Sequence, residues 1–149
     1  MMETDQGLAR FVAAQDRGHT FDQAVAELHL GRKRSHWIWY VFPQIDGLGY
    51  SDMSRRYALA SLEEARGYLA HPVLGPRLRE AARALLGVEN RTIVTILGPV
   101  DAQKVRSCMT LFMRAEPADG LYCEVLEAYF DGEPDVETER ILAVGDKPH

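Results

Sequence analysis

The sequence predicts an all-α protein, a single compact domain of about seven or eight short helices. Three observations support this. Apolar residues recur at helical spacing along most of the chain, capping-type residues precede several of these stripes, and Gly or Pro follows them. Residues 35–42, the most strand-like segment, show no clean alternation of polar and apolar residues, so we expect any sheet to be minor. We assign one domain to residues 1–149, with a core of about 7–142 and flexible ends.

The first half of the chain contains two predicted helices and one ambiguous segment. The stripe of residues 4–15 ends at Asp16, and a second helix runs from Thr20, spaced as a capping box with Gln23, to a C-terminal glycine at Gly31. The segment 35–42 is rich in aromatic and β-branched residues and fits either a strand or a two-turn helix beginning at Ser35. Residues 43–52 form a predicted loop.

The second half is strongly helical by pattern. The predicted helices are Ser61 to about His71 (a capping box with Glu64), Leu74 to Leu85, Asp101 to Ala115, Leu121 to Phe130, and Asp135 to Val144. Residues 92–97 are short and β-branched, and Gly98-Pro99 ends them. Because no repeat or linker interrupts this series, these helices belong to one domain.

Composition indicates a globular protein with an uneven charge. Hydrophobic residues make up 46% and charged residues 26% of 149 residues, with a net charge of −5. Residues 115–149 carry ten acidic and two basic residues, a net charge of −8, so the remainder carries +3. The basic part can therefore attract an anionic partner, while a solvated acidic face is the simpler interpretation.

The apolar runs, the N-terminal residues and the cysteine spacing predict where the protein is located and whether it binds a metal. No apolar run is long enough to span a membrane, and the N-terminus lacks the apolar stretch of a secretory signal. Cys108 and Cys123 have no metal-type spacing, and we interpret them as reduced thiols. We therefore expect a cytoplasmic protein without metal or cofactor.

One string of residues resembles a known family. The sequence from Gly31 to Gln44, with Lys33-Arg34-Ser35-His36-Trp37 and Phe42-Pro43-Gln44, is similar to the bacterial domain-of-unknown-function family numbered 1810. Further matching pieces include His71-Pro72 and Met109-Thr110-Leu111-Phe112, so the resemblance covers about residues 7–142. It implies an all-helical fold and favours helix for 35–42, but it implies no activity and no catalytic residues.

The same string holds the main candidate site. Cations beside aromatic rings and an amide suit a phosphate-bearing ligand such as a nucleotide, because Arg and Lys bind phosphate and Trp stacks on a base. The candidate ligand-binding residues here are Arg32, Lys33, Arg34, Trp37, Trp39 and Gln44, and the candidate acid/base is His36. The alternative is structural: the aromatics anchor a core, and the cations complement the end of a helix.

A second candidate cluster lies on a predicted helix. Lys104, Ser107 and Thr110 are three residues apart and share roughly one helix face. We predict that this face converges with residues 32–44, with Lys104 and Ser107 contributing to one binding site. An ordinary solvated face is the simpler interpretation.

Function remains open between two classes. The first is a protein that binds a phosphorylated small molecule, with or without turnover, and the second is a non-enzymatic module that binds a protein partner or another copy of itself. Phosphate-loop, dinucleotide-binding, hydrolase and zinc-protease motifs are absent from the sequence. The negative net charge and short basic run argue against nucleic acid as the partner.

Overall fold

The fold is all-helical over the described part of the chain. The computed structural model describes residues 2–145, and the side chains of residues 7–144. Its helices are, in order, α1 (Met2–Asp16), the 3-10 helix η1 (Arg17–His19), α2 (Thr20–His29), α3 (Ile38–Val41), α4 (Asp52–Arg56), α5 (Leu62–Ala70), α6 (Leu74–Leu86), α7 (Ile93–Leu97), α8 (Pro99–Ala115), α9 (Leu121–Phe130) and α10 (Val136–Gly145). The predicted fold class is confirmed, with more helices than the seven or eight expected.

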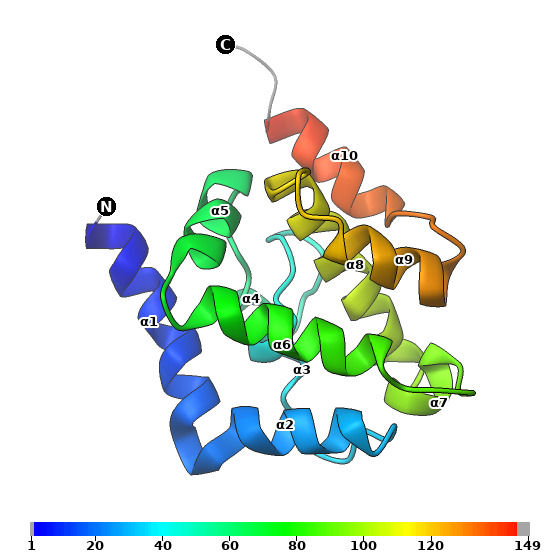
Figure 1. The fold of residues 1–149 in the computed structure, drawn as a ribbon. Helices are drawn as coiled ribbons and strands as arrows, with labels where there is room; N and C mark the ends of the chain where they lie inside the picture. The colour runs from blue at the N-terminus through cyan, green and yellow to red at the C-terminus, as the bar shows by residue number, and fades with distance from the viewer. Residues whose placement is uncertain (1, 146–149) are drawn as a thin grey trace.

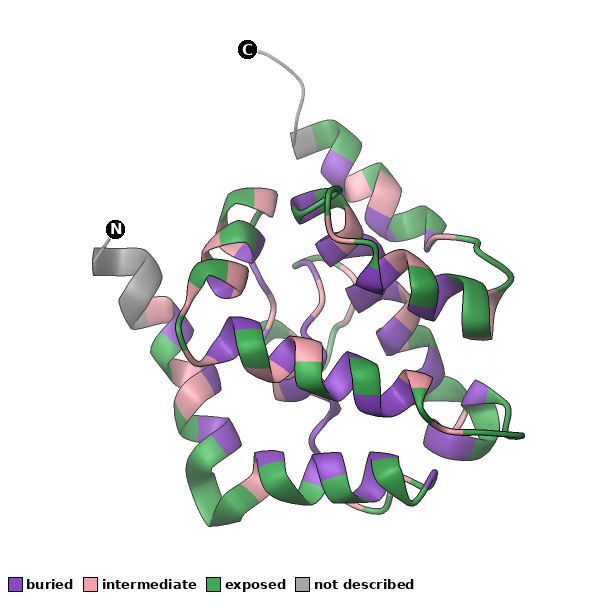
Figure 2. Ribbon diagram, in the orientation of Figure 1, coloured by how far each residue is buried: buried purple, intermediate pink, exposed green. Residues whose placement is uncertain are grey.

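Two helices organise the packing. α8 packs against α5, α7, α9 and α10, while α6 packs against α2, α5 and α9 (Figure 1). The residues that face these contacts are buried and the outward residues are exposed, as the alternating colours along each helix show (Figure 2). α8 supplies a large share of the core because its stripe Val105, Cys108, Met109 and Phe112 is fully buried.

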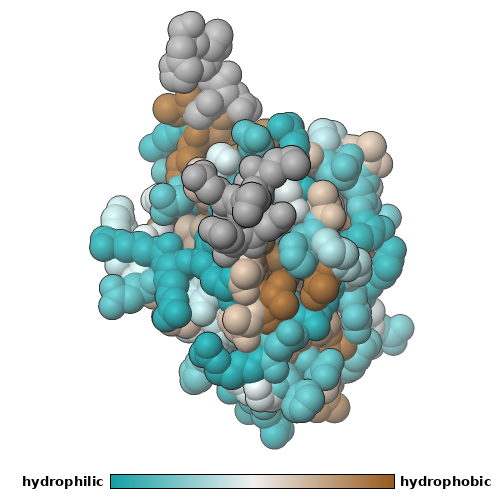
Figure 3. All heavy atoms as spheres, turned by 90° about the vertical axis from the view of Figure 1, so that its left-hand side faces the viewer, coloured by the Kyte–Doolittle hydropathy of each residue, from teal (hydrophilic) through white to brown (hydrophobic). Residues whose placement is uncertain are grey.

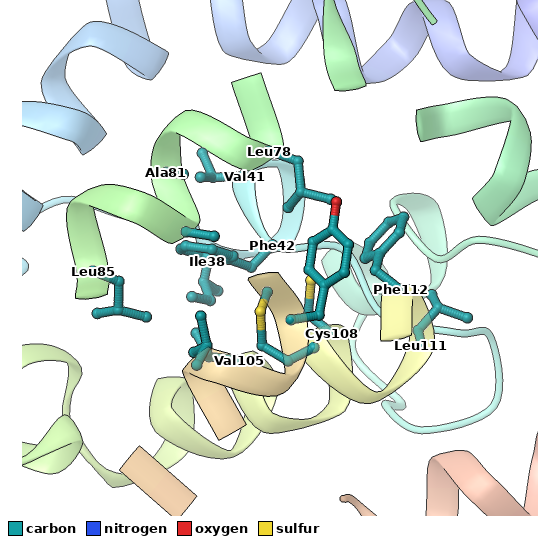
Figure 4. Close-up of a cluster of buried hydrophobic side chains, with 14 of the residues drawn as sticks. Ile38, Val41, Phe42, Leu78, Ala81, Leu85, Val105, Cys108, Leu111 and Phe112 are labelled. Atoms are coloured by element: carbon teal, nitrogen blue, oxygen red, sulfur yellow. The ribbon is translucent and has the colours of Figure 1, made fainter. Parts of the chain in front are cut away.

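The short helix α3 joins these two organising helices. Ile38, Val41 and Phe42 lie between side chains of α6, such as Leu85, and side chains of α8, such as Val105 (Figure 4). Buried apolar surface is worth roughly 25 cal/mol per Å², so this insertion fixes the segment's position in the fold. Ile38, Val41 and Phe42 thus serve the core.

Several predicted helix boundaries require correction. The helix within 35–42 begins at Ile38, after Trp37, and Ser35 does not cap it. α2 begins after His19 in a left-handed conformation, and the Thr20 hydroxyl donates to the Arg17 carbonyl, so the capping box with Gln23 does not form. Asp101 lies in the first turn of α8, because that helix already begins at Pro99.

Other predicted boundaries are confirmed. The Ser61 hydroxyl caps α5 by accepting the Glu64 N–H at 3.0 Å, and Asp135 caps α10 by accepting the Thr138 N–H at 3.0 Å. The β-branched segment 92–97 is the helix α7, capped by Thr92. Our prediction that the chain ends are flexible concerns residues before 7 and after 142, which lie partly outside those described, and it stays a prediction.

The 43–59 region has the single strand-like feature among residues 2–145. Ile45 and Leu59 form an isolated parallel bridge, in which the Leu59 N–H donates to Gln44 and the Asp46 N–H donates to Leu59. This pairing ties the predicted loop to the segment that leads into α5. Within residues 2–145, none of the helices is both long and apolar enough to cross a membrane.

Candidate functional site

The candidate site begins where α2 ends. Gly31 has a φ of +73°, a left-handed conformation that glycine adopts without steric cost. The Gly31 N–H donates to Leu28 and the Arg32 N–H to Glu27, which is the hydrogen-bond pattern of a Schellman motif. Gly31 is thus confirmed as the predicted helix terminator, and the chain turns sharply into residues 32–37.

A buried carboxylate holds this turn in place. Glu27 Oε1 accepts hydrogen bonds from the Arg34 N–H at 2.8 Å, the Ser35 N–H at 3.0 Å and the Trp37 indole at 2.9 Å. Glu27 Oε2 accepts the Ser35 hydroxyl at 2.6 Å. The carboxylate is only 6% exposed, and these four donors satisfy it. They pin residues 34–37 against α2.

The electrostatics of Glu27 follow from these donors. Burial alone raises the pKa of a carboxyl group, but the bonds from Ser35, Arg34 and Trp37 outweigh burial and lower the pKa of Glu27 from 4.5 to about 2. Glu27 is therefore ionised at neutral pH. The Ser35 N–H is occupied by this carboxylate and is therefore not available to a phosphate.

Next to this turn, two lysines share one aspartate. Lys33 Nζ lies 2.8 Å from Asp101 Oδ2, and Lys104 Nζ lies 3.5 Å from Asp101 Oδ1. All three side chains are mostly buried, with exposed fractions of 9%, 18% and 18% for Lys33, Asp101 and Lys104. The trio carries a net charge of +1 in a place with little solvent, where electrostatic interactions are stronger than at the surface.

Aromatic rings complete the cluster. Lys33 Nζ lies 5.1 Å from the ring centroid of Trp37, and Lys104 Nζ lies 5.7 Å from that of Trp39, both within cation–π range. Trp39 and Tyr40 are half-buried neighbours with centroids 6.2 Å apart. We call Lys33, Asp101, Lys104 and Trp39 the lysine–tryptophan cluster.

Part of the predicted convergence is thus observed. The structure brings Lys33 and Trp39 from the 32–44 segment beside Lys104 of α8. Two other predicted ligand-binding residues require correction. Trp37 is fully buried and cannot stack on a ligand, and Ser107 is 2% exposed with its hydroxyl donated to the Gln103 carbonyl within α8. Both residues therefore serve the core.

The remaining predicted residues lie nearer the surface. Arg32, Arg34 and His36 have exposed side chains, and Gln44 is half-buried. The His36 carbonyl accepts the Tyr40 hydroxyl at 2.8 Å, but its imidazole makes no hydrogen bond or ion pair with a described residue. The acid/base role of His36 stays a prediction.

Sequence reasoning missed two residues that shape the site. Glu27 holds the turn in place. Its spacing in the sequence could have indicated this role, because Ala24, Glu27 and Leu28 share one face of α2 and a carboxylate therefore lies within the buried stripe. Asp101 forms ion pairs with both lysines. Its three-residue spacing to Lys104 could have predicted one of these pairs. Both signals are common in surface helices, which is why they did not stand out.

Two further kinds of reactive group among the described residues are potential metal ligands and thiols. These residues contain no group of three His, Cys, Asp or Glu side chains placed to hold a metal ion. Both cysteines are free thiols, and burial raises the pKa of the Cys108 thiol. A protonated, buried thiol is a poor nucleophile.

The fold and the site together define a small all-helical domain with a basic and aromatic cluster between its α2–α3 turn and α8. The chain belongs to the family described as "protein of unknown function (DUF1810)", whose model matches residues 5–142. The family resemblance is thereby confirmed.

A solved structure supports the fold. The chain is similar to the conserved hypothetical protein Rv1873 from Mycobacterium tuberculosis, known from a crystal structure, with 46% sequence identity and a TM-score of 0.89. The match covers 91% of this chain and 96% of the other. No curated protein matches the chain.

Proposed function

We propose that this protein binds a small phosphate-bearing molecule, such as a nucleotide, at the lysine–tryptophan cluster. The observation that carries the proposal is that two mostly buried ammonium groups, Lys33 and Lys104, share the single carboxylate of Asp101. One positive charge in this trio therefore has no matching negative charge. A phosphate group would supply it.

The ammonium groups of the two lysines differ in the number of oxygen atoms that they contact. This difference indicates which lysine would bind the ligand. Lys33 Nζ also donates to the Ser35 carbonyl at 2.5 Å, so it is held by two oxygen atoms. Among the described residues, the one oxygen contact of Lys104 Nζ is the longer one to Asp101 at 3.5 Å. An ammonium group has three N–H donors, so Lys104 retains donors for a phosphate while Lys33 orients Asp101.

The aromatic side of the cluster suits the rest of such a ligand. Trp39 is half-buried, so part of its ring faces solvent beside Lys104. A base or sugar ring stacked there would lie next to the phosphate-binding ammonium group, and stacking of a base on an aromatic ring is worth roughly 1–3 kcal/mol. The exposed cations Arg32 and Arg34 precede this site along the chain and raise the local positive potential.

Calorimetric titration tests the proposal. We expect ADP and pyrophosphate to bind, and adenosine to bind far more weakly. A ligand at one hundred times its Kd would also stabilise the fold by about 2.7 kcal/mol in thermal unfolding. Lys104→Gln is expected to weaken ADP binding at least tenfold, whereas Arg83→Gln, which removes an exposed cation from α6, serves as the charge-matched control.

Two results would contradict the proposal. One is the absence of binding by ADP, pyrophosphate and other phosphorylated compounds at low salt. The other is equal weakening by Lys104→Gln and Arg83→Gln, because a uniform loss would indicate general charge attraction rather than a defined site.

A protein interface is the second candidate, favoured by the exposed apolar residues around α7. Leu30, Val94 and Val100 are 71%, 49% and 67% exposed and belong to the end of α2, to α7 and to the start of α8, which lie at one end of the molecule (Figure 1). On a second copy of the chain, the acidic residues of α9 and α10 would supply negative charge for the basic residues 32–34, which follow Leu30. Light scattering tests this: a dimer that Val94→Asp dissociates would support it, and a monomer at all concentrations would contradict self-association.

A further inference from the structure

We propose a second binding site, independent of the lysine–tryptophan cluster, in the groove between α5 and α10. The geometry points to a small organic monocarboxylate with an apolar body. Its hydrocarbon part would occupy the cavity under Leu62 and Ile141, and its carboxylate would bind the guanidinium of Arg66.

The groove consists of two adjoining cavities. One has a volume of about 380 Å³ and is lined by apolar Ile45, Leu62, Ile141 and Leu142 with Ser61, Glu63 and Arg66. The other, about 340 Å³, continues along α10 towards Arg114. Leu62, Arg66 and Leu142 line both, so Arg66 lies where the two cavities meet. Each volume falls at the small end of the range for ligand sites.

Three separate segments build the walls of this groove. The backbone pairing of Ile45 with Leu59 places Ile45 at the foot of α5, where it is 3% exposed. Gly47, with a φ of +105°, lets the same loop pass close to α10, because a Cβ there would lie 3.3 Å from Ile141 Cδ1. The buried Asp135 cap holds α10 against α8. Three segments that lie far apart in the sequence therefore meet at this cavity.

The apolar character of the α10 wall extends to the surface. On the face shown in Figure 3 the hydrophobic atoms just below the uppermost grey chain end belong to the end of α10, and most of the surrounding surface is hydrophilic. Val144 on this last turn is 63% exposed. Val144 lines neither cavity, but the half-buried Leu62 and Ile141 do line the first, and a ligand with an apolar body would cover them.

The charge of Arg66 indicates the head group of the ligand. Arg66 Nε donates to the Ala115 carbonyl at 3.3 Å, which anchors the side chain and leaves the terminal N–H groups for another partner. Among the described residues, no carboxylate lies within ion-pair distance of Arg66, whereas neighbouring Arg114 is paired with Glu139 through two hydrogen bonds. A planar guanidinium with free donors binds a carboxylate in two-point fashion.

The acidic residues at the rim argue for a ligand with one negative charge. Glu63 lines the first cavity, and Glu139, which is already paired with Arg114, lines the second. The acidic and basic side chains of the two cavities therefore balance, and a phosphate or dicarboxylate would bring an unmatched second negative charge next to Glu63. A monocarboxylate with a short hydrocarbon chain satisfies Arg66 and adds little repulsion. Polyanions are therefore expected at the lysine–tryptophan cluster and monoanions in this groove.

Titration with hexanoate, hexanamide and adipate tests the assignment on the full chain. We expect hexanoate to bind with millimolar or better affinity, hexanamide to bind at least tenfold more weakly, and adipate to bind more weakly than hexanoate. Hexanoate binding would leave ADP binding unchanged, so failure of either site is distinguishable from failure of the other.

Two variants separate the polar and the apolar parts of the site. Arg66→Gln is expected to lower the affinity for hexanoate at least tenfold with little effect on hexanamide. Ala60→Leu, at an exposed position that lines the cavity, would fill it and weaken both ligands. Arg83→Gln again serves as the charge control, and circular dichroism confirms that each variant is folded. No binding of hexanoate, or equal binding by wild type and Arg66→Gln, would overturn the proposal.

Discussion

Two buried carboxylates, Glu27 and Asp135, each organise a turn of this molecule, and they differ in the donors that they accept. Asp135 caps the helix it precedes, accepting the Thr138 N–H and hydroxyl three residues away. Glu27 accepts donors seven to ten residues away, across the turn that carries the candidate site. Asp135 also accepts the Gln103 amide of α8 at 2.6 Å, so its carboxylate caps α10 and ties that helix to α8. The difference teaches that Asp135 stabilises the position of one helix, whereas the Glu27 network fixes the geometry of the loop that carries the candidate site.

The largest expected effect is at Glu27. Glu27→Ala leaves the Trp37 indole and two backbone N–H groups buried without an acceptor, and we expect a loss of about 3 kcal/mol in the free energy of unfolding. Urea unfolding measures it. Glu27→Gln keeps one acceptor oxygen and is expected to lose about half as much. A loss below about 1 kcal/mol in Glu27→Ala would show that the network is not a main support of the turn.

The contribution of Glu27 to stability can also be measured through its dependence on pH. The pKa of Glu27 is about 2 in the folded protein and near 4.5 when unfolded, so its contribution to stability is fully present above pH 4.5. That contribution declines as the pH falls towards 2, and at pH 3 we expect a loss of about 2 kcal/mol. Comparing urea unfolding of wild type and Glu27→Gln at pH 7 and pH 3 isolates this group. An identical pH dependence in the two proteins would contradict the assignment.

The Asp135 cap of α10 is expected to contribute less to the free energy of unfolding than the Glu27 network. Asp135→Ala removes the acceptor for the Thr138 N–H and for the Gln103 amide at 2.6 Å, and we expect a loss of about 1.5 kcal/mol. Thermal unfolding measures it, with Asp135→Asn as the variant that retains an acceptor. If Asp135→Ala cost more than Glu27→Ala, the order of importance in our comparison would be reversed.

The smallest expected losses of stability are at Ser61, whose helix cap forms, and at Thr20, whose expected cap does not. Ser61→Ala removes an observed cap and is expected to cost about 1 kcal/mol. Thr20→Ala removes a hydroxyl that donates to Arg17 without capping α2, and it is expected to cost less than about 0.5 kcal/mol. Chemical unfolding of the two variants side by side checks this, and equal losses would mean that the α2 cap forms in solution.

These cases also show what the sequence could predict. The apolar stripes, the caps at Ser61 and Asp135 and the Gly31 terminator were correctly predicted, because each depends on residues within one helical turn. The caps expected at Thr20, Ser35 and Asp101 do not form. The all-α class was confirmed for the same reason. The extent of α3 was not predictable, since its four residues are helical because they fit between α6 and α8 rather than through any intrinsic preference.

The site was predictable in its composition but not in its geometry. Residues 32–44 and Lys104 do converge through Asp101, yet nothing in the pattern indicated that Trp37 would be core and Trp39 half-buried. Two aromatic residues two positions apart on a short turn point to different sides, and their burial depends on tertiary contacts. The groove beside Arg66 brings together residues about eighty positions apart, which no local pattern encodes.

The most direct test of the central claim uses the two tryptophans of the chain. A nitrogen–proton correlation spectrum contains one indole signal for each, and Trp39→Phe assigns them. We predict that ADP shifts the Trp39 indole signal saturably in the wild type and fails to do so in Lys104→Gln, while the buried Trp37 signal moves much less. A Trp39 signal that stays unchanged while ADP shifts backbone signals elsewhere would contradict binding at the lysine–tryptophan cluster.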